Sequence, residues 1–362
     1  MTGAPRTVLH YLGYDDDAGG IVSVVRALAA AGRYKCVLGM NPGARQRREP
    51  ALPVMEFSRL AGEEIGLANF WRARAVANEV RTWLREDERR VFHGHSRAGL
   101  LAGWWLHRMG ERRAVVSVHC YGRQRWFYRW AAKRLGSRLF WLTPEMRRYY
   151  GAPGRDREQC LPGGVTPDYF ALTPAPPVPG RLRLGGAGEL SHWKRWDLVP
   201  AALARLAPEA RRQVTFEHIG APAAGADSRA WAAELRRIVD ASGVAEMTSW
   251  RGPEASSHRM LSEIDLLLVT SHREPYSMIL QEALAAGVPV LAPASGGPVD
   301  VVNPGQNGWL FRDGDAASLA DVLAQQVKTR EWATLDRAAI RQTARRAEDA
   351  AAEWADVYAG LD

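Results

Sequence analysis

Short apolar runs alternate with helical patterns along the first 145 residues of the chain. The runs are typical of buried strands and fall at 7–13, 36–39, 91–94, 114–119 and 139–142. Apolar residues at helical spacing lie between them, at 19–31, 72–84, 98–109 and 125–135. Strands alternating with helices predict parallel β-α-β units with right-handed crossovers.

A segment rich in Pro and Gly, residues 162–180, interrupts this pattern, and we expect a linker without a helix or central strand there. The alternation then resumes, with strands predicted at 181–184, 214–219, 265–269 and 288–292. The helices predicted with them lie at 198–206, 230–242, 278–286 and 317–328, and a tail at 332–358 reads as one or two helices. The sequence therefore predicts two open α/β domains whose ligands bind at the carboxyl ends of the strands and in the cleft between domains.

Charge differs between the two halves of the chain. The net charge of +8 divides into +12 over residues 1–180 and −4 over residues 181–362. A basic half attracts nucleic acid, an anionic membrane or a phosphorylated acceptor. The alternative is that an arginine-rich protein carries this charge for solubility alone, since 44 of its 48 basic residues are Arg.

Several protein classes do not fit this chain. No apolar run is long enough to cross a membrane, and the N-terminus lacks the apolar stretch of a signal peptide. Cys36, Cys120 and Cys160 are widely spaced, which indicates reduced thiols in a cytosolic protein. We therefore expect a cytoplasmic location.

The most informative chemistry lies between residues 271 and 300. A strand is followed by a polar loop with Glu274-Pro275, a helix beginning near Ser277, and a second strand that enters the turn 295–297. The free N–H groups of the helix N-terminus suit an anionic or hydroxyl-rich ligand. Glu274 and Glu282 can accept hydrogen bonds from sugar hydroxyls, or Glu274 simply caps the helix and Glu282 is a solvated charge.

These residues resemble the signature of retaining family 4 sugar-nucleotide glycosyltransferases, in which Glu-x7-Glu precedes a segment like Ala283–Val290. The resemblance extends over nearly the whole chain, through Gly19-Gly20, His119, 161–165, 188–194 and 307–310. It implies the GT-B fold, in which two Rossmann-like domains face a cleft. The implied boundaries are an acceptor-binding domain 1–165, a hinge 166–180 and a donor-binding domain 181–344. A C-terminal helix at about 345–362 crosses back to the first domain.

The resemblance also implies roles for individual residues. Catalysis would depend on Glu274 at the donor sugar, Lys194 at the diphosphate and His119 facing the sugar. The residues implied to bind the donor are Gly20, Arg251, Ser277, Met278, Ile279 and Glu282. We expect Arg195 to bind the donor as well, on its positive charge and not on the resemblance. Gly19, His95 and Arg123 are candidates on the acceptor side.

The chain departs from the family pattern at four positions. Glu189 stands where the family has an Arg, and Arg195 where it has a Gly, so we expect Arg195 or His192 to supply the second positive charge. Tyr276-Ser277 replaces Phe-Gly, and a side chain at 277 would narrow the sugar pocket.

A rival motif lies at 93–99, where Gly94-x-Ser96 between a strand and a helix resembles the nucleophile elbow of a serine hydrolase. Its fifth position is Ala98 instead of Gly, and neither His258 nor His272 lies in an obvious terminal loop after an acidic residue. The glycines at 185–188 do not form a dinucleotide-binding motif.

Trp and Arg interleave between residues 104 and 148, where eleven Lys/Arg accompany only Glu111 and Glu145. Such a helix suits an anionic membrane interface, a soluble anionic acceptor or single-stranded nucleic acid, or it is a helix with buried aromatics and solvated arginines.

Together these observations predict a retaining hexosyltransferase that moves a sugar from a UDP- or GDP-linked donor to a hydroxyl acceptor. The expected acceptor is a cell-surface glycan, a lipid-linked glycan or a small glycoside, at the inner face of the membrane. We expect no metal, no other cofactor and no nucleic acid. Alternatives are a nucleotide-sugar epimerase, a non-catalytic glycan- or membrane-binding descendant, and a serine hydrolase using Ser96.

Overall fold

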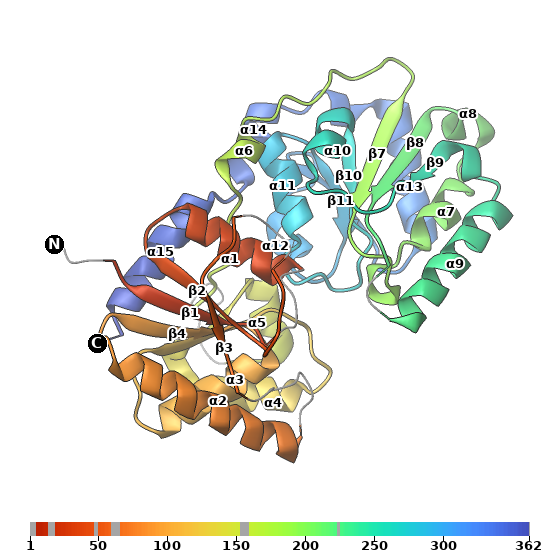
Figure 1. Cartoon of the computed structure of the whole chain (residues 1–362). Helices are drawn as coiled ribbons and strands as arrows, with labels where there is room; N and C mark the ends of the chain where they lie inside the picture. Colours follow the sequence, from red (N-terminus) through yellow and green to blue (C-terminus); the bar gives the residue numbers. More distant parts are fainter. Residues whose placement is uncertain are drawn as a thin grey trace. The chain divides into compact units, whose positions relative to one another are not determined.

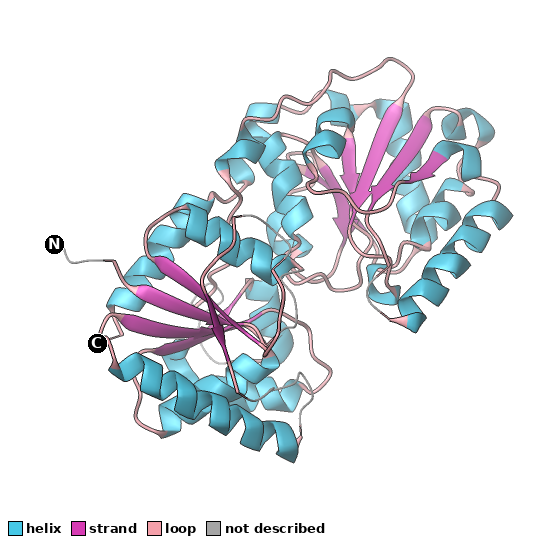
Figure 2. Ribbon diagram, in the orientation of Figure 1, coloured by secondary structure: helices cyan, strands magenta, loops and turns pink. Residues whose placement is uncertain are grey.

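The computed structural model describes residues 5–13, 19–46, 50–58, 66–152, 159–222 and 225–361. The chain divides into two compact units. The N-terminal unit comprises residues 1–166 and 346–362, and the C-terminal unit comprises residues 167–345. Each unit is a twisted parallel sheet covered by helices on both faces (Figures 1 and 2).

The N-terminal unit is built on a six-stranded sheet of order β3-β2-β1-β4-β5-β6. Its strands are β1 (Thr7–Tyr11), β2 (Lys35–Met40), β3 (Val54–Glu56), β4 (Arg90–Gly94), β5 (Ala114–Val118) and β6 (Leu139–Trp141). Its helices are α1 (Gly20–Ala30), α2 (Leu67–Arg85), α3 (Arg97–Arg108), α4 (Arg125–Leu135), α5 (Pro144–Tyr150) and α15 (Ala347–Ala359). Helices α1 and α15 cover one face, and α2, α3 and α4 cover the other (Figure 1).

The C-terminal unit repeats this plan with the strand order β12-β11-β10-β7-β8-β9. Its strands are β7 (Leu182–Ala187), β8 (Val214–Ile219), β9 (Thr248–Trp250), β10 (Leu266–Leu268), β11 (Val290–Pro293) and β12 (Gly308–Phe311). Its helices are α6 (Pro167–Phe170), α7 (Leu198–Leu203), α8 (Pro208–Arg211), α9 (Ala226–Ala241), α10 (His258–Glu263), α11 (Met278–Ala286), α12 (Pro298–Val301), α13 (Ala316–Thr329) and α14 (Arg337–Thr343). One core packs α7, α9 and α13 against the sheet, and a second packs α10, α11 and α14 against its other face.

The predicted α/β class with two parallel, Rossmann-like sheets is confirmed. One prediction about the Pro-rich segment is wrong, because the short helix α6 begins there at Pro167. Proline is tolerated at the first helical position, where its missing N–H would have no partner in any case. Helix α2 begins at Leu67, five residues before the predicted start, and the short strands β3, β9 and β12 were not predicted.

Close packing at one turn positions the carboxyl edge of the N-terminal sheet. A Cβ at Gly94 would lie 2.6 Å from the carbonyl oxygen of Gly99. The start of α3 therefore packs directly against the end of β4, with Ser96 as its N-cap. Among the described residues, no helix combines the length and apolar character needed to cross a bilayer.

Candidate active site

An ion pair joins two predicted site residues that lie 80 positions apart in the C-terminal unit. Lys194 Nζ lies 3.0 Å from Glu274 Oε2 and 3.3 Å from Oε1. The side chains are only 13% and 9% exposed. Lys194 follows β7 and Glu274 follows β10, neighbouring strands whose carboxyl ends meet at one edge of the sheet. The fold thus gathers a cation and a carboxylate where parallel sheets bind ligands.

The loop that carries Glu274 is held by a glycine turn. The Gly297 amide donates to the Glu274 carbonyl at 2.8 Å. A Cβ at Gly297 would lie 2.3 Å from the Pro275 carbonyl oxygen, and a Cβ at Gly296, whose φ is 66°, would lie 2.5 Å from the Glu274 carbonyl oxygen. Only glycine permits this approach, so the turn at 295–297 fixes the backbone of Glu274.

Lys194 is fixed through its backbone and its neighbours. It ends the 3-10 helix His192–Lys194, and its carbonyl accepts a 2.6 Å hydrogen bond from Thr270 Oγ1. Its ammonium lies 4.1 Å from the centroid of the Trp193 ring, close enough for a cation–π contact. Thr270 was missed at the sequence level, because only the fold brings it beside Lys194.

Helix α11 begins next to Glu274 without a side-chain cap. Ser277, immediately before it, has a φ of 59°, a left-handed conformation that favours glycine. Its hydroxyl is buried and has no hydrogen-bond partner within the described residues. The N-terminal amides of α11, including those of Met278 and Ile279, therefore form an uncapped anion-binding end.

Glu282 lies in the second turn of α11 and is held inside the unit. Its Oε2 accepts a 2.6 Å hydrogen bond from Ser257 Oγ, which also lies 3.1 Å from the Tyr169 hydroxyl. Burial raises the pKa of the Tyr169 hydroxyl, and the nearby negative charge of Glu282 raises it further. The sequence pointed to neither partner, since Tyr169 lies in the segment predicted to be a linker.

The residues expected to supply further positive charge are engaged elsewhere. Arg195 pairs with Asp197 at 3.0 Å, and the His192 ring packs on Trp231 with centroids 4.1 Å apart. Glu189, the residue that departs from the family pattern, accepts from Trp193 Nε1 at 2.9 Å. Its carboxylate also accepts a hydrogen bond from Ser191 Oγ at 3.0 Å. Two donors of its own loop therefore stabilise the negative charge of Glu189.

Arg251 follows β9 and is about half exposed. Its guanidinium lies 3.5 Å from Glu217 and 3.7 Å from Glu254. Its amide donates to the carbonyl of His218, a buried histidine at the end of β8. Burial lowers the pKa of His218 to about 3, so its imidazole is neutral, and no sequence motif had pointed to this residue.

The remaining predicted residues belong to the N-terminal unit. Gly19, with a φ of 97°, precedes α1, and Gly20 is the first residue of that helix. His95 and His119 are joined by a 3.0 Å contact between His95 Nδ1 and His119 Nε2. Arg123 is exposed in the loop before α4. The structure thus joins His95 to His119, and Ile21, the residue after Gly20, lines the same cavity as both histidines.

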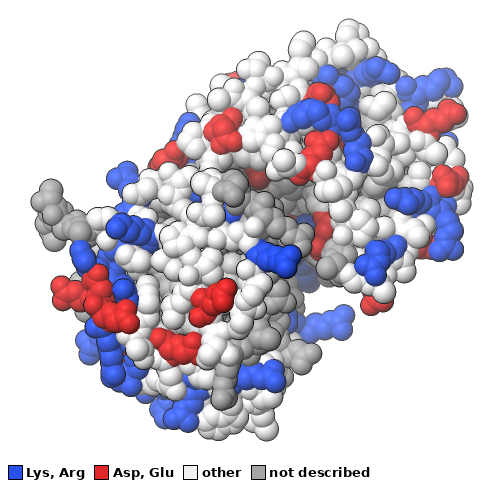
Figure 3. Space-filling view, viewed as in Figure 1, with Lys and Arg blue, Asp and Glu red and all other residues white. Residues whose placement is uncertain are grey.

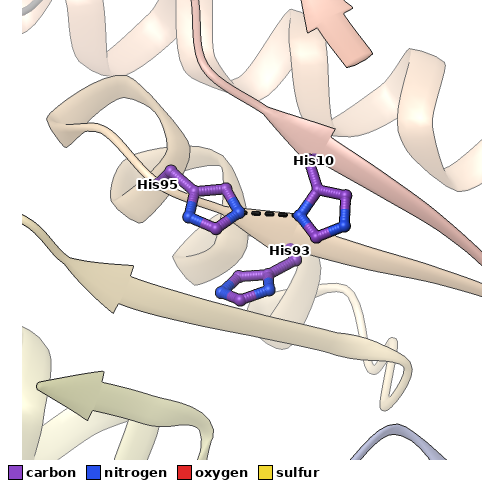
Figure 4. Close-up of side chains that lie close together, drawn as sticks. All are labelled: His10, His93 and His95. Carbon is purple, nitrogen blue, oxygen red and sulfur yellow. Dashed lines mark hydrogen bonds between the residues drawn. The ribbon is translucent and has the colours of Figure 1, made fainter. Parts of the chain in front are cut away.

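Four histidines gather at the carboxyl edge of the N-terminal sheet, which no sequence spacing had indicated. His10 Nδ1 lies 2.9 Å from His95 Nε2 (Figure 4). His93 Nδ1 lies 2.7 Å from the Tyr358 hydroxyl. The accessible ring nitrogens of His10, His93 and His95 lie within 4.8 Å of one another. The His93 and His95 rings stack at 3.9 Å instead of converging on a common point, so these contacts form a hydrogen-bonded core.

Burial keeps these imidazoles neutral. It lowers the pKa of His10 to about 3 and that of His119 to about 4, and it lowers the pKa of His93 and His95 as well. A neutral imidazole has one donor and one acceptor nitrogen, which suits a chain of imidazole hydrogen bonds.

The geometry at Ser96 contradicts the hydrolase alternative. Its hydroxyl accepts from the Gly99 amide at 3.0 Å as the N-cap of α3. Its φ and ψ of −113° and 177° are extended, unlike the strained turn of a nucleophile elbow. His93 and His95 are bonded to other groups. Ser96, His95 and His119 instead line a cavity of about 80 Å³ together with Tyr128.

Comparisons with known proteins agree with this geometry. Residues 180–347 match the family described as Glycosyl transferases group 1. D-inositol 3-phosphate glycosyltransferase of Stackebrandtia nassauensis is 31% identical over 189 residues, 48% of this chain and 41% of the relative. The protein of that name from Xylanimonas cellulosilytica is 32% identical over 238 residues, 59% and 54% of the two chains. The chain thus spans about half the length of the curated relatives it matches.

Solved structures resemble the chain over almost its whole length. HepE of Anabaena, in complex with UDP-glucose, has a TM-score of 0.74 at 18% identity, covering 98% of this chain and 99% of that one. WaaG, a glycosyltransferase involved in lipopolysaccharide biosynthesis, has a TM-score of 0.70 at 16% identity, covering 98% and 100%. The fold is therefore GT-B, and residues 180–347 of the C-terminal unit are similar to the glycosyl transferases group 1.

Proposed function

We propose that this protein is a retaining glycosyltransferase that moves a hexose from a nucleotide sugar to a hydroxyl acceptor without a metal. The observation that carries the proposal is the buried Lys194–Glu274 pair beside the uncapped N-terminus of α11. An ammonium and free helix amides suit a diphosphate, and a carboxylate suits sugar hydroxyls. The match of residues 180–347 to the glycosyl transferases group 1 supports the same assignment.

The reaction breaks the bond between the anomeric carbon and the diphosphate, which departs with the electron pair. The acceptor oxygen bonds the anomeric carbon, and its proton passes to the departing diphosphate. Lys194 and the amides of Met278 and Ile279 stabilise the growing negative charge, and in many enzymes such stabilisation supplies most of the rate enhancement. Glu274 orients the donor sugar, and Glu282 binds the ribose hydroxyls. In this proposal His119 of the N-terminal unit faces the donor sugar.

The donor we propose is UDP- or GDP-linked. HepE of Anabaena binds UDP-glucose, which makes a UDP-sugar the first donor to test. The acceptor is a glycan, a lipid-linked glycan or a small glycoside bound by the N-terminal unit. An inositol phosphate is included, because the curated relatives are named for one. We place the reaction at the inner face of a membrane, where a lipid-linked acceptor would lie.

Thermal stability against a nucleotide panel tests the donor site. UDP, GDP, ADP, CMP and their common sugar conjugates are added to the wild-type protein, to Glu282→Ala and to Glu246→Ala. Glu246 is an exposed residue of the same unit and serves as the matched control. A ligand at 100 times its dissociation constant stabilises by about 2.7 kcal/mol, which raises the melting temperature by several degrees.

We expect one nucleotide class to raise the melting temperature of wild type and Glu246→Ala but not of Glu282→Ala. No shift with any nucleotide at millimolar concentration would contradict the proposed donor site. Release of free UDP or GDP in the presence of an acceptor, measured with the responding sugar conjugate, then tests transfer itself.

A further inference from the structure

Helices α2, α3 and α4 carry an aromatic surface on the side away from the N-terminal sheet. Three of its apolar side chains are strongly exposed: Leu67 at 82%, Trp126 at 60% and Trp71 at 53%. A single exposed apolar side chain is common on a protein surface, but a contiguous group of them marks a binding surface. The sequence pattern had indicated only residues 104–148, so α2 is a new part of this surface.

Ring contacts make the surface continuous across the three helices. Trp71 of α2 lies 5.7 Å from Trp105 of α3, measured between ring centroids, and Trp104 lies 5.3 Å from Trp130 of α4. Trp126 and Trp130 are four residues apart and therefore share one side of α4. We call this surface the tryptophan face; it comprises Leu67, Phe70, Trp71, Trp104, Trp105, Trp126 and Trp130.

The three helices that carry the tryptophan face are strongly basic. Helices α2, α3 and α4 contain ten Lys or Arg and a single acidic residue, Glu79, which accepts from the Ser58 amide. The Arg74 guanidinium lies 5.6 Å from the Trp71 ring centroid and 5.2 Å from that of Trp105. Figure 3 shows both acidic and basic side chains on the side of the molecule in view. Ten basic residues less one acidic residue give these three helices a net charge of +9, against +8 for the whole chain, so the excess of positive charge lies on them.

We propose that the tryptophan face docks onto the surface of an anionic lipid bilayer. Tryptophan is the side chain that prefers the interface between lipid and water, and Lys and Arg beside it attract anionic headgroups. Helices that bind in this plane combine an apolar strip with a basic surround. The inference deepens the membrane location given under the proposed function, and it requires no sugar transfer.

Two other occupants fit the observations less well. A second copy of the chain would bring two surfaces of net positive charge together across a twofold interface, which is repulsive. A single-stranded nucleic acid would stack on exposed aromatic rings. The most exposed apolar residue of the face, however, is the aliphatic Leu67, which inserts into lipid and offers no ring for stacking.

Vesicle sedimentation tests the proposal with the whole chain. Vesicles of phosphatidylcholine alone, and with a third of phosphatidylglycerol, are compared at 0.05 M and 0.5 M salt for wild type and for Trp71→Ser/Trp126→Ser. Both side chains are more than half exposed, so the double variant is expected to melt within 2 °C of wild type. Val178→Ser, an exposed apolar position in the C-terminal unit, is the matched control.

We expect wild type and Val178→Ser to sediment with the anionic vesicles at low salt, at least tenfold more strongly than with neutral ones. We expect high salt or the double substitution to reduce binding at least tenfold. Equal binding by wild type and the double variant would overturn the proposal. So would displacement by single-stranded DNA with no vesicle binding, or a dimer that the double substitution dissociates. A nucleotide-dependent rise in melting temperature for the double variant keeps the proposed donor site separate from this outcome.

Discussion

Removing the lysine of the buried pair tests whether Lys194 and Glu274 act together as the geometry indicates. In Lys194→Met the side chain keeps its length and loses its charge, leaving a carboxylate that is only 9% exposed without a cation. Breaking one partner of a buried pair costs about 3 kcal/mol, the lower end of the observed range, because both side chains retain some contact with water.

The size of this cost sets the expected change in melting temperature. The C-terminal unit, Pro167–Arg345, has 179 residues. An unfolding entropy of about 2.1 cal/mol/K per residue gives about 0.38 kcal/mol/K for the unit. The melting temperature of this unit should therefore fall by about 8 °C in Lys194→Met, measured by scanning calorimetry.

Lys328→Met is the matched control, because Lys328 is exposed on α13 in the same unit. It should change stability by less than about 0.5 kcal/mol. The double variant Lys194→Met/Glu274→Leu should lose less than the sum of the two single changes, since neither charge is then left without its partner. If Lys194→Met had the same melting temperature as Lys328→Met, the reasoning would be refuted.

Three further outcomes follow from the same contacts. Glu274→Gln should bind UDP several-fold more tightly by titration calorimetry while losing transfer, because Lys194 no longer pairs with a carboxylate; weaker binding would contradict this. Burial lowers the pKa of His10 to about 3 and of His119 to about 4, so the unfolded chain, with a histidine pKa near 6.5, binds more protons. The free energy of unfolding is therefore highest above pH 6.5 and falls with the pH, by about 1.4 kcal/mol per histidine between pH 8 and 5.5. A melting temperature that calorimetry finds unchanged over this range would argue against this. Gly297→Ala should cost about 1–3 kcal/mol and weaken nucleotide-sugar binding, because its Cβ would lie 2.3 Å from the Pro275 carbonyl oxygen; unchanged binding would show that this turn does not position Glu274.

The fold was accessible from the sequence because its signals are local. Runs such as Val214–Ile219 and helices such as α11 are visible in apolar periodicity, and two series of them imply two parallel sheets. Short elements were missed where periodicity has too few residues to register. The strand β12 has four residues, and α6 begins at a proline that otherwise indicates a linker.

The candidate site was only partly accessible, because its contacts join distant residues. Motif resemblance indicated Lys194 and Glu274, but their 3.0 Å pairing depends on neighbouring strands separated by 80 positions. The hydrogen bonds from Ser257 to Glu282 and from Thr270 to the Lys194 carbonyl carry no sequence signal. The exposure of Leu67 likewise depends on which side of α2 faces the sheet.

Helix α15 gives the N-terminal unit a discontinuous sequence, with a consequence for synthesis on the ribosome. Trp354 packs on Phe140 with centroids 4.9 Å apart, and the Tyr358 hydroxyl bonds His93, so α15 completes a core begun some 250 residues earlier. Chains commonly fold in the order in which their domains emerge. Here the unit made first lacks helix α15 until residues 347–359 are translated, whereas the continuous C-terminal unit is complete before then. The second unit can therefore reach its native state first, and a nascent chain stalled after residue 345 would display an unfinished N-terminal core to chaperones.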